Sequence, residues 1–434
     1  MPYVLTALLV VLLLVNYLAN KKELIAPSFV FVASFIFSVV WAIAFYDEWN
    51  LSTFSFKTLL VIFGGCIIFT LSSSLTKAII NIISKKNDNK YKIRLISIDV
   101  TIKSLTILFI LFSTIMTLRS VINAVGYSWS NLFDAIEKFD HLSKFSNQNI
   151  GIGKIANILR IIANALTYWY LYILINNIII RKKIDTLSLI IVIFGMLSSM
   201  AIGGRNNTIN VVIAGVAILF MLLYKSKGFN LRLSKKAKIA IVLIPALVLV
   251  TFPKLTSLVG REVNTTSTYY LAIYCGADIK NLDLFLEEYD RERYADKNNM
   301  TFINLNNWLG PKLGYTEPYK YDLPFRRINE YSLGNVYTTF YAYIYDYGFL
   351  GLIVLVALMA IILQYVYEKA KRTELSNAPN IWILIYGYMF SSIVLAFFSN
   401  KFYEQNFNIS FVYNIVLWLI FNKTILLIKI KRKK

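Results

Sequence analysis

The chain has 434 residues, of which 57% are apolar and 16% are charged, and its formal net charge is +21. A soluble protein of this length would be less apolar, so the composition argues against the soluble globular classes. Repeated apolar runs of roughly 18–22 residues, separated by short charged links, predict an all-α polytopic membrane protein. The ~10-residue alternating segments of a membrane β-barrel are missing from the sequence.

About eleven apolar runs are predicted to be membrane spans. They cover residues 2–18, 26–46, 58–76, 105–125, 155–180, 187–202, 209–224, 239–252, 343–367, 381–398 and 409–428. Residues 1–252 therefore hold eight spans, residues 253–334 form one long loop with short helices, and residues 335–434 hold three spans and a basic tail. Long ordered loops commonly carry the working site of a protein.

The lysines and arginines are concentrated in alternate links between the spans. Basic links at 21–22, 85–94, 181–183 and 225–238 alternate with links such as Asp47-Glu48. Because basic links stay in the cytoplasm, this pattern predicts an external N-terminus, a cytoplasmic C-terminus and an external 253–334 loop. The first apolar run is followed, not preceded, by its positive charges, which favours an uncleaved span. Topology thus accounts for the net charge, and no nucleic-acid partner is expected.

Segment 131–145 is predicted to be an amphipathic helix on the outer membrane surface. Its apolar residues fall near helical spacing: Leu132, Phe133, Ile136, Phe139 and Leu142. His141, the single histidine, falls on the polar face. An imidazole can act as an acid or base near neutral pH, although a solvated side chain is the ordinary interpretation. Cys66 and Cys275 are far apart in sequence, so neither a disulfide nor a metal site is expected.

The 253–334 loop carries nearly equal numbers of both charges and many aromatic residues. Residues 278–297 are predicted to form a helix, because Leu282, Phe285, Leu286 and Tyr289 share one face. Residues 304–324 are predicted to be rich in turns because of their glycines and prolines. Tyrosine and tryptophan in such a loop can stack on sugar rings, and they are also common at membrane interfaces.

Arginines recur at the predicted outer membrane face. Arg205 lies between two spans, Arg261 follows the eighth span, and Arg326-Arg327 precedes the ninth. A guanidinium group offers a planar fork of donors that suits phosphate oxygens, and it stays charged. These arginines together are predicted to hold a pyrophosphate, whereas any one of them alone is more typical of a surface charge.

Two carboxylates and two glycines complete the predicted site. Gly203 and Gly204 precede Arg205 and a helix start, where backbone N–H groups can bind an anion. Glu330 and Asp346 lie close to the outer membrane face, and either could be a general base for a sugar hydroxyl. The alternative for each carboxylate is a structural pair with Arg or Tyr.

Several of these features together resemble the Wzy-type O-antigen and capsule repeat-unit polymerases. The resemblance rests on the layout of spans and late external loop, on Gly203-Gly204-Arg205, and on the run from Gly334-Asn335-Val336-Tyr337 to Asp346-Tyr347-Gly348 and Gly351. It implies a glycosyltransferase of the bacterial cytoplasmic membrane that extends glycans on undecaprenyl pyrophosphate at the outer face.

The resemblance also implies roles for residues and partners. Arg205 and Arg327 would be catalytic, because members of that family depend on arginines in external loops. Glu330 and Asp346 are expected to be catalytic from their position and chemistry alone. The substrate-binding residues would be Gly203, Gly204, Arg261, Arg326, Asn335 and Tyr337. Partners would be lipid-linked glycans, the bilayer and a chain-length regulator. Arginines would stabilise the pyrophosphate leaving group, so no metal or cofactor is expected. Two alternatives stay open at this point: an O-antigen ligase, whose usual loop histidine has only His141 as a candidate, in a different loop, and a transporter of lipid-linked sugars.

Overall fold

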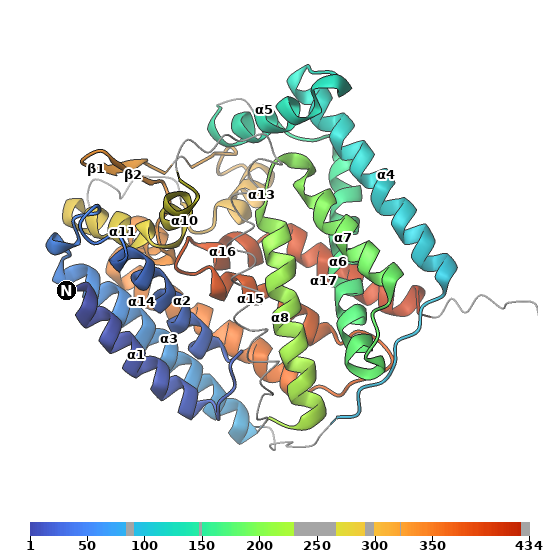
Figure 1. Cartoon of the computed structure of the whole chain (residues 1–434), viewed down its shortest axis with the longest axis horizontal. Helices are drawn as coiled ribbons and strands as arrows, with labels where there is room; N and C mark the ends of the chain where they lie inside the picture. The colour runs from blue at the N-terminus through green and yellow to red at the C-terminus, as the bar shows by residue number, and fades with distance from the viewer. Residues whose placement is uncertain (84–90, 147–149, 230–265, 291–298, 322, 427–434) are drawn as a thin grey trace, which may run out of the picture. The chain divides into compact units, whose positions relative to one another are not determined.

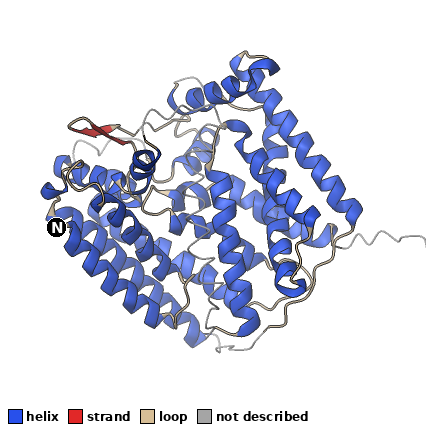
Figure 2. Cartoon of the chain, viewed as in Figure 1, coloured by secondary structure: helices blue, strands red, loops and turns tan. Residues whose placement is uncertain are grey.

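The computed structural model of the chain describes residues 1–83, 91–146, 150–229, 266–290, 299–321 and 323–426. These residues are mostly helical (Figure 1), and Figure 2 shows one small two-stranded sheet among them. The chain divides into two compact units, each built from three separate stretches of sequence. The first unit contains residues 1–88, 265–369 and 389–409, and the second contains residues 89–264, 370–388 and 410–434.

The first unit joins the N-terminal helices to the described part of the long loop. Its elements are α1 (Pro2–Ala19), α2 (Pro27–Ile43), η1 (Leu51–Thr53), α3 (Phe56–Ile83), α10 (Ser267–Cys275), α11 (Ala277–Glu288), α13 (Ile303–Leu313), β1 (Arg326–Ile328), β2 (Tyr331–Gly334), α16 (Lys401–Asn406) and most of α14 (Thr339–Arg372). Helices α1, α2 and α3 pack on one another, and α10 and α11 pack against α2. The loop is therefore folded onto membrane helices and shares their core.

The second unit is built around the long helix α6. Its elements are α4 (Val100–Val125), η2 (Trp129–Asn131), α5 (Leu132–Phe145), α6 (Lys154–Arg181), α7 (Thr186–Ser199), η3 (Met200–Ile202), α8 (Asn206–Lys227), most of α17 (Ile409–Thr424) and the first part of α15 (Ile381–Val394). Helix α6 packs against α4, α7 and α8. It also carries Trp169, whose buried indole donates a hydrogen bond to Asn422 Oδ1 at 2.8 Å.

Local sequence explains where several helices begin and end. Pro2 and Pro27 occupy the first turns of α1 and α2, where the absent N–H costs nothing and the fixed φ suits a helix. Asp99 caps α4 by accepting the Thr101 N–H at 2.8 Å. Gly126 ends α4 with φ of 73°, a left-handed conformation that glycine adopts without steric cost.

Six described helices are long and apolar enough to cross a membrane: α1, α3, α4, α6, α8 and α14. Shorter apolar helices at 27–43, 186–202, 381–394 and 409–424 coincide with four other predicted spans. The all-α membrane class is thereby confirmed. The count of about eleven spans stays a prediction, and the predicted span at 239–252 lies outside the described residues.

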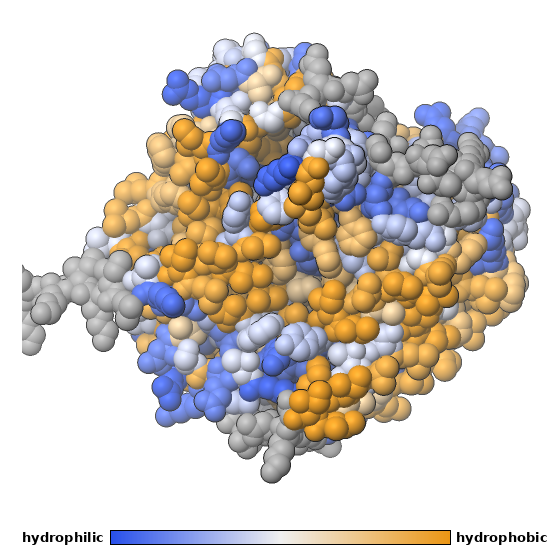
Figure 3. Space-filling model, turned by 180° about the vertical axis from the view of Figure 1, so that it is seen from behind, coloured by the Kyte–Doolittle hydropathy of each residue, from blue (hydrophilic) through white to orange (hydrophobic). Residues whose placement is uncertain are grey.

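Apolar side chains are widely exposed on these long helices. Val11 and Leu14 on α1, Leu71 on α3, and Leu105 and Leu108 on α4 are each more than half exposed. Figure 3 shows extensive apolar surface on one face of the molecule. A soluble monomer rarely exposes apolar patches of this extent, so lipid is the expected covering.

Helix α5 forms where the amphipathic segment was predicted. Ile136 and Phe139 are buried and pack with Val121 of α4 in a small apolar cluster. Phe133, which was assigned to the apolar face, is 60% exposed, and His141 is exposed as well. The helix thus packs on protein through a narrower stripe than predicted, because Leu132, Ile136 and Phe139 belong to this cluster whereas Phe133 faces away from it.

The structure corrects two predictions for the long loop. Helix α11 ends at Glu288, well short of the predicted 297, and residues 291–298 lie outside the described part of the chain. Residues 303–313 form helix α13 instead of the predicted turns, since Pro311 falls in the last turn and Gly314 caps the end with φ of 71°. The β1–β2 hairpin was not predicted, because its turn, Asn329-Glu330, lacks the usual glycine.

Candidate functional site

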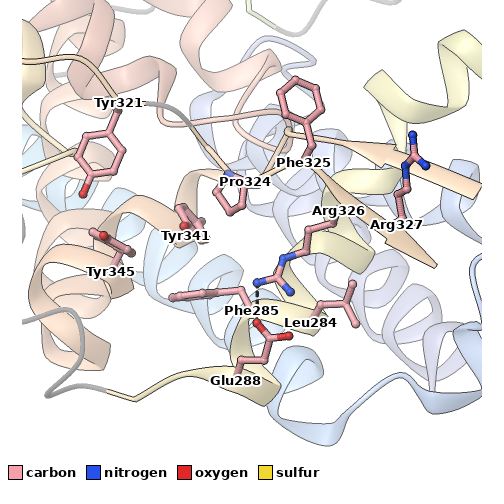
Figure 4. Close-up of a pocket in the computed structure, with 10 residues that line it drawn as sticks. All are labelled: Leu284, Phe285, Glu288, Tyr321, Pro324, Phe325, Arg326, Arg327, Tyr341 and Tyr345. Atoms are coloured by element: carbon pink, nitrogen blue, oxygen red, sulfur yellow. Dashed lines mark hydrogen bonds and ion pairs between the residues drawn. The ribbon is translucent and has the colours of Figure 1, made fainter. Parts of the chain in front are cut away.

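The described part of the first unit contains a pocket of about 580 Å³ beside the β1–β2 hairpin (Figure 4). It is lined by Leu284, Phe285, Glu288, Tyr321, Pro324, Phe325, Arg326, Arg327, Tyr341 and Tyr345. Three segments supply these residues: the last turns of α11, the approach to β1 and the first turns of α14. Its volume and its mixture of aromatic walls with a few charged groups are typical of small-ligand sites.

Arg326 is the charged centre of this pocket. Its Nη2 donates to Glu288 Oε2 at 2.8 Å, and its Nε donates to the Tyr337 hydroxyl at 3.1 Å. Burial alone would lower the pKa of Arg326, but the hydrogen bonds with Glu288 and Tyr337 hold it above its ordinary value. The guanidinium group is therefore permanently charged and fixed in direction.

Tyrosines form one wall of the pocket. Tyr341 and Tyr345 lie one turn apart on α14 with ring centroids 5.7 Å apart, and Tyr337, just before the helix, lies 4.3 Å from Tyr341. Phe285 of α11 meets Tyr341 edge-on at 4.5 Å, and Tyr321 meets Tyr345 edge-on at 5.7 Å. Burial and the neighbouring Tyr345 raise the pKa of Tyr321, so its hydroxyl stays neutral.

The hairpin that carries Arg326 is fixed from below by α11 and α10. Asn281 Nδ2 donates to the carbonyls of Leu333 at 3.1 Å and Val336 at 2.8 Å. The Tyr269 hydroxyl of α10 donates to the Ser332 carbonyl at 2.8 Å. These bonds tie β2 to two helices, so the position of the arginine is set by the buried part of the unit.

Helix α11 is itself held by buried polar contacts. Asp283 accepts hydrogen bonds from Thr58 Oγ1 at 2.6 Å and Lys280 Nζ at 2.8 Å, and all three side chains are buried. Asp278 accepts from Ser38 Oγ at 3.0 Å. A buried charge is costly unless it is paired and hydrogen-bonded, and here the buried ionisable side chains of α11, Asp278, Lys280 and Asp283, each have a hydrogen-bond partner. Helix α11 is thus stabilised by buried polar contacts as well as by the apolar face from which it was predicted.

The pocket combines features that suit a carbohydrate. The tyrosine and phenylalanine rings offer faces and edges for stacking, and the hydroxyls and guanidinium offer hydrogen bonds. Glu288 is 54% exposed in its side chain, whereas Arg326 is 17% exposed. The carboxylate therefore reaches the solvent-filled part of the pocket, where it could accept a proton from a bound hydroxyl.

The structure divides the predicted residues of this unit into three groups. Arg326 and Arg327 line the pocket, although Figure 4 shows the Arg327 guanidinium pointing away from Glu288. Tyr337 is buried and orients Arg326. Glu330 is exposed at the hairpin turn, and Asn335 is half-buried just after β2.

Asp346 holds the backbone before α13 in place, a structural role that the sequence did not reveal. Its carboxylate accepts backbone hydrogen bonds from Met300 at 3.0 Å and Thr301 at 2.6 Å. Two residues later, Gly348 interrupts α14 with φ of 71° and ψ of −166°, a conformation that only glycine adopts easily. The aspartate and glycine of this stretch therefore shape the start of α14 and anchor the loop before α13.

The remaining predicted residues do not join this pocket. Arg205, Gly203 and Gly204 belong to the second unit, and Arg261 lies outside the described residues. Arg205 is buried at the start of α8. Gly203 has φ of 80° and lies so close to Asp140 that an added Cβ would approach the Asp140 Cβ to 2.5 Å. The convergence of all four arginines on one pyrophosphate stays a prediction.

The sequence could have predicted the tyrosine wall of the pocket but not the pairing of Glu288 with Arg326. The four-residue spacing of Tyr341 and Tyr345 places both rings on one face of a helix, which could have been interpreted as a binding wall. Nothing in the sequence links Glu288 with Arg326, because their pairing depends on where the hairpin folds back.

No protein-family model, curated protein or solved structure matches this chain. Among the described residues, no group of three or more His, Cys, Asp or Glu side chains is arranged to hold a metal ion. The functional interpretation therefore depends on the residues and their geometry.

Proposed function

We propose that the chain is a repeat-unit polymerase of the bacterial cytoplasmic membrane. It would transfer a growing glycan from undecaprenyl pyrophosphate to a sugar hydroxyl of a new lipid-linked repeat unit at the outer face. The single observation that supports this most is the pocket in which Arg326 and Glu288 lie beside a wall of tyrosines. The Wzy-type features of the sequence supply the lipid-linked substrate class.

The chemistry can be written with this chain's own side chains. Tyr341 and Tyr345 would stack on sugar rings of the acceptor, and Arg326 would orient Glu288. Glu288 would take the proton as the acceptor oxygen forms its bond to the anomeric carbon. The bond from that carbon to the pyrophosphate oxygen breaks, and the leaving group keeps the electron pair. Arginines, with Arg205 and Arg261 as the other expected contributors, would stabilise the charge that develops there.

The test is polymer formation by the purified full chain in detergent or nanodiscs with a lipid-linked repeat unit. We expect a ladder of products on a gel from the native chain. Arg326→Ala should reduce the rate by about 100-fold or more, since a charge-assisted contact of this kind is typically worth 10²–10³ in rate. Arg327→Ala is the matched control on the same strand, and its expected loss is smaller because its side chain points away from Glu288.

Three results would count against the proposal. Absence of any ladder from the folded native chain would exclude polymerisation of that substrate. Movement of the lipid-linked unit across vesicles without a new glycosidic bond would indicate a transporter. Transfer of a finished glycan to a different acceptor, with loss of activity in His141→Ala, would indicate a ligase.

A further inference from the structure

The ammonium group of Lys57, in the first turn of α3, reaches the end of helix α11. Its Nζ donates a hydrogen bond to the Leu286 carbonyl at 2.8 Å. Leu286 lies two residues before Glu288, which is the last residue of α11 and the carboxylate of the pocket. The last four carbonyls of a helix have no partner within the helix, and a cation is favoured at that end because of the helix dipole. Lys57 therefore caps the turn that carries Glu288.

Two aromatic rings flank the same ammonium group. Lys57 Nζ lies 5.7 Å from the ring centroid of Tyr289 and 5.6 Å from that of Phe349. The two rings contact each other edge-on, with their centroids 5.7 Å apart. A cation within about 6 Å of a ring centroid is attracted by the face of the ring. Because Tyr289 directly follows α11 and Phe349 belongs to α14, the ammonium group joins three elements that are distant in sequence.

On α14, the contacts of the α11 end fall on both sides of the helix kink. Phe349 follows Gly348, where φ of 71° and ψ of −166° interrupt α14. On the other side of the kink, the Tyr289 hydroxyl donates to the Ile344 carbonyl at 3.4 Å. Tyr345, which follows Ile344, lines the pocket. Lys57 and Tyr289 together therefore fix the end of α11 to the part of α14 that forms the tyrosine wall.

The pocket takes three of its lining residues from the last turns of α11 (Figure 4): Leu284, Phe285 and Glu288. The ring of Phe285 also meets that of Tyr289 edge-on at 5.5 Å. Lys57 is not itself part of the described lining. It therefore acts on the pocket through the backbone of α11, whereas Arg326 holds the Glu288 carboxylate directly at 2.8 Å.

We infer that Lys57 is a positioning residue for Glu288. Without its ammonium group, the last turn of α11 loses a hydrogen bond and two ring contacts, and the Glu288 side chain is held less firmly beside the tyrosine wall. A general base acts only within hydrogen-bond reach of the proton it takes, and a displacement of about 1 Å can reduce a rate by ~10²-fold. The role of Glu288 as the base rests on the proposed polymerase activity, whereas the anchorage of its turn by Lys57 does not.

Hydrogen exchange of the full chain in nanodiscs, measured without substrate, tests the anchorage. Lys57→Met nearly keeps the length of the side chain and removes its charge and its donors. We expect amide exchange in the last turn of α11, residues 285–288, to become about 10-fold faster, because this turn opens more often without its cap. Lys312→Met is the matched control and should exchange like the native chain, since the Lys312 ammonium lies 4.0 Å from the Trp308 ring centroid in the same unit and outside the pocket lining.

The kinetics of ladder formation test the effect on Glu288. In Lys57→Met we expect kcat to fall about 10-fold while KM for the lipid-linked acceptor changes by less than about threefold, since the substitution affects the base and not the sugar contacts. Added to Glu288→Gln, the same substitution should cause no further loss, because both changes act through one carboxylate. Lys57→Arg keeps a cation at the helix end and should keep kcat within about threefold of the native value.

Native exchange or a native kcat in Lys57→Met would overturn the inference. So would a change in KM alone, or an undiminished loss on the Glu288→Gln background, because Lys57 would then act on the substrate or on another group. Lys57→Gln, which also removes the charge, serves if the methionine variant does not fold. Faster exchange in Lys57→Met without polymer formation by the native chain would leave the anchorage standing and remove the proposed function. Polymer formation by the native chain with unchanged exchange in the variant would do the reverse.

Discussion

The two units present arginine in opposite ways. In the first, Arg326 is carried by a hairpin and is held by Glu288 and Tyr337. In the second, Arg160 is carried by a long membrane helix, and its buried Nε has no partner among the described residues. The guanidinium of Arg326 is thus fixed in direction by two partners, whereas that of Arg160 makes one hydrogen bond among the described residues, with Asn157. The difference shows that the loop hairpin surrounds its arginine with more polar partners than the membrane helix does.

Hydrogen bonds hold both the Arg326 side chain and the strand that carries it in place. Taking a charge out of water is costly, and the cost is offset only where a well-placed partner and further hydrogen bonds satisfy the group, as Glu288 and Tyr337 do for Arg326. Asn281 and Tyr269 then fix the strand behind it through backbone carbonyls. In the second unit, Gly203 packs closely on Asp140, since an added Cβ would lie 2.5 Å from the Asp140 Cβ.

The strongest test of the comparison is the carboxylate of the pocket. Glu288→Gln keeps the shape and a hydrogen-bonding side chain but removes the base, so we expect the polymerisation rate to fall on the order of 10²-fold or more. The rate is measured from ladder formation at saturating substrate. Glu330→Gln, at the exposed hairpin turn, is the control and should keep its rate. A larger loss in Glu330→Gln would move the base to the turn and break the assignment.

The second test concerns the backbone between η3 and α8, where Gly203 packs on Asp140. Gly203→Ala combines a positive φ with a clash against Asp140, so we expect a loss of about 2 kcal/mol in the free energy of unfolding. Gly204→Ala is a control one residue away, because an added Cβ there meets nothing within 4 Å. Thermal unfolding in detergent compares the two variants. Equal melting temperatures would show that the close packing on Asp140 is unimportant.

Substitutions of Tyr341 distinguish the contribution of its ring to sugar stacking from the contribution of its hydroxyl. Its ring lies between Tyr337 and Phe285, at 4.3 Å and 4.5 Å. Tyr341→Ala should raise the KM for the lipid-linked acceptor by about 10-fold, in keeping with the ~0.5–1.5 kcal/mol worth of an aromatic contact beyond its buried area. Tyr341→Phe keeps the ring and should change KM by less than about threefold. A phenylalanine variant as poor as the alanine variant would assign the effect to the hydroxyl instead.

Much of the fold was accessible from the sequence, because membrane helices are set by apolar length alone. Ten of the predicted spans coincide with described helices, and the amphipathic helix at 132–145 forms as expected. Periodicity also located α11, but not its end, since residues after Glu288 continue a polar pattern that fits either a helix or a loop. Local pattern therefore found elements better than boundaries.

The candidate site was less accessible, since it depends on contacts between distant residues. Arg326 was singled out by chemistry alone, but its partner Glu288 lies 38 residues earlier in the chain. Arg160 was taken as part of a span, because one charge in a long apolar run does not disturb the hydropathy pattern.

The smallest expected effect is that of Asp346→Asn, which tests whether the Asp346 carboxylate is structural or catalytic. Asp346→Asn leaves one acceptor for the backbone N–H groups of Met300 and Thr301, so we expect a loss of about 1 kcal/mol in the free energy of unfolding. The polymerisation rate at saturating substrate should fall by less than about fivefold, because an anchoring bond acts on position and not on proton transfer. Thermal unfolding and ladder kinetics on the same preparation measure both quantities. A stable variant whose rate falls as far as that of Glu288→Gln would make Asp346 a second essential carboxylate, and the pocket would then extend to the kink at Gly348.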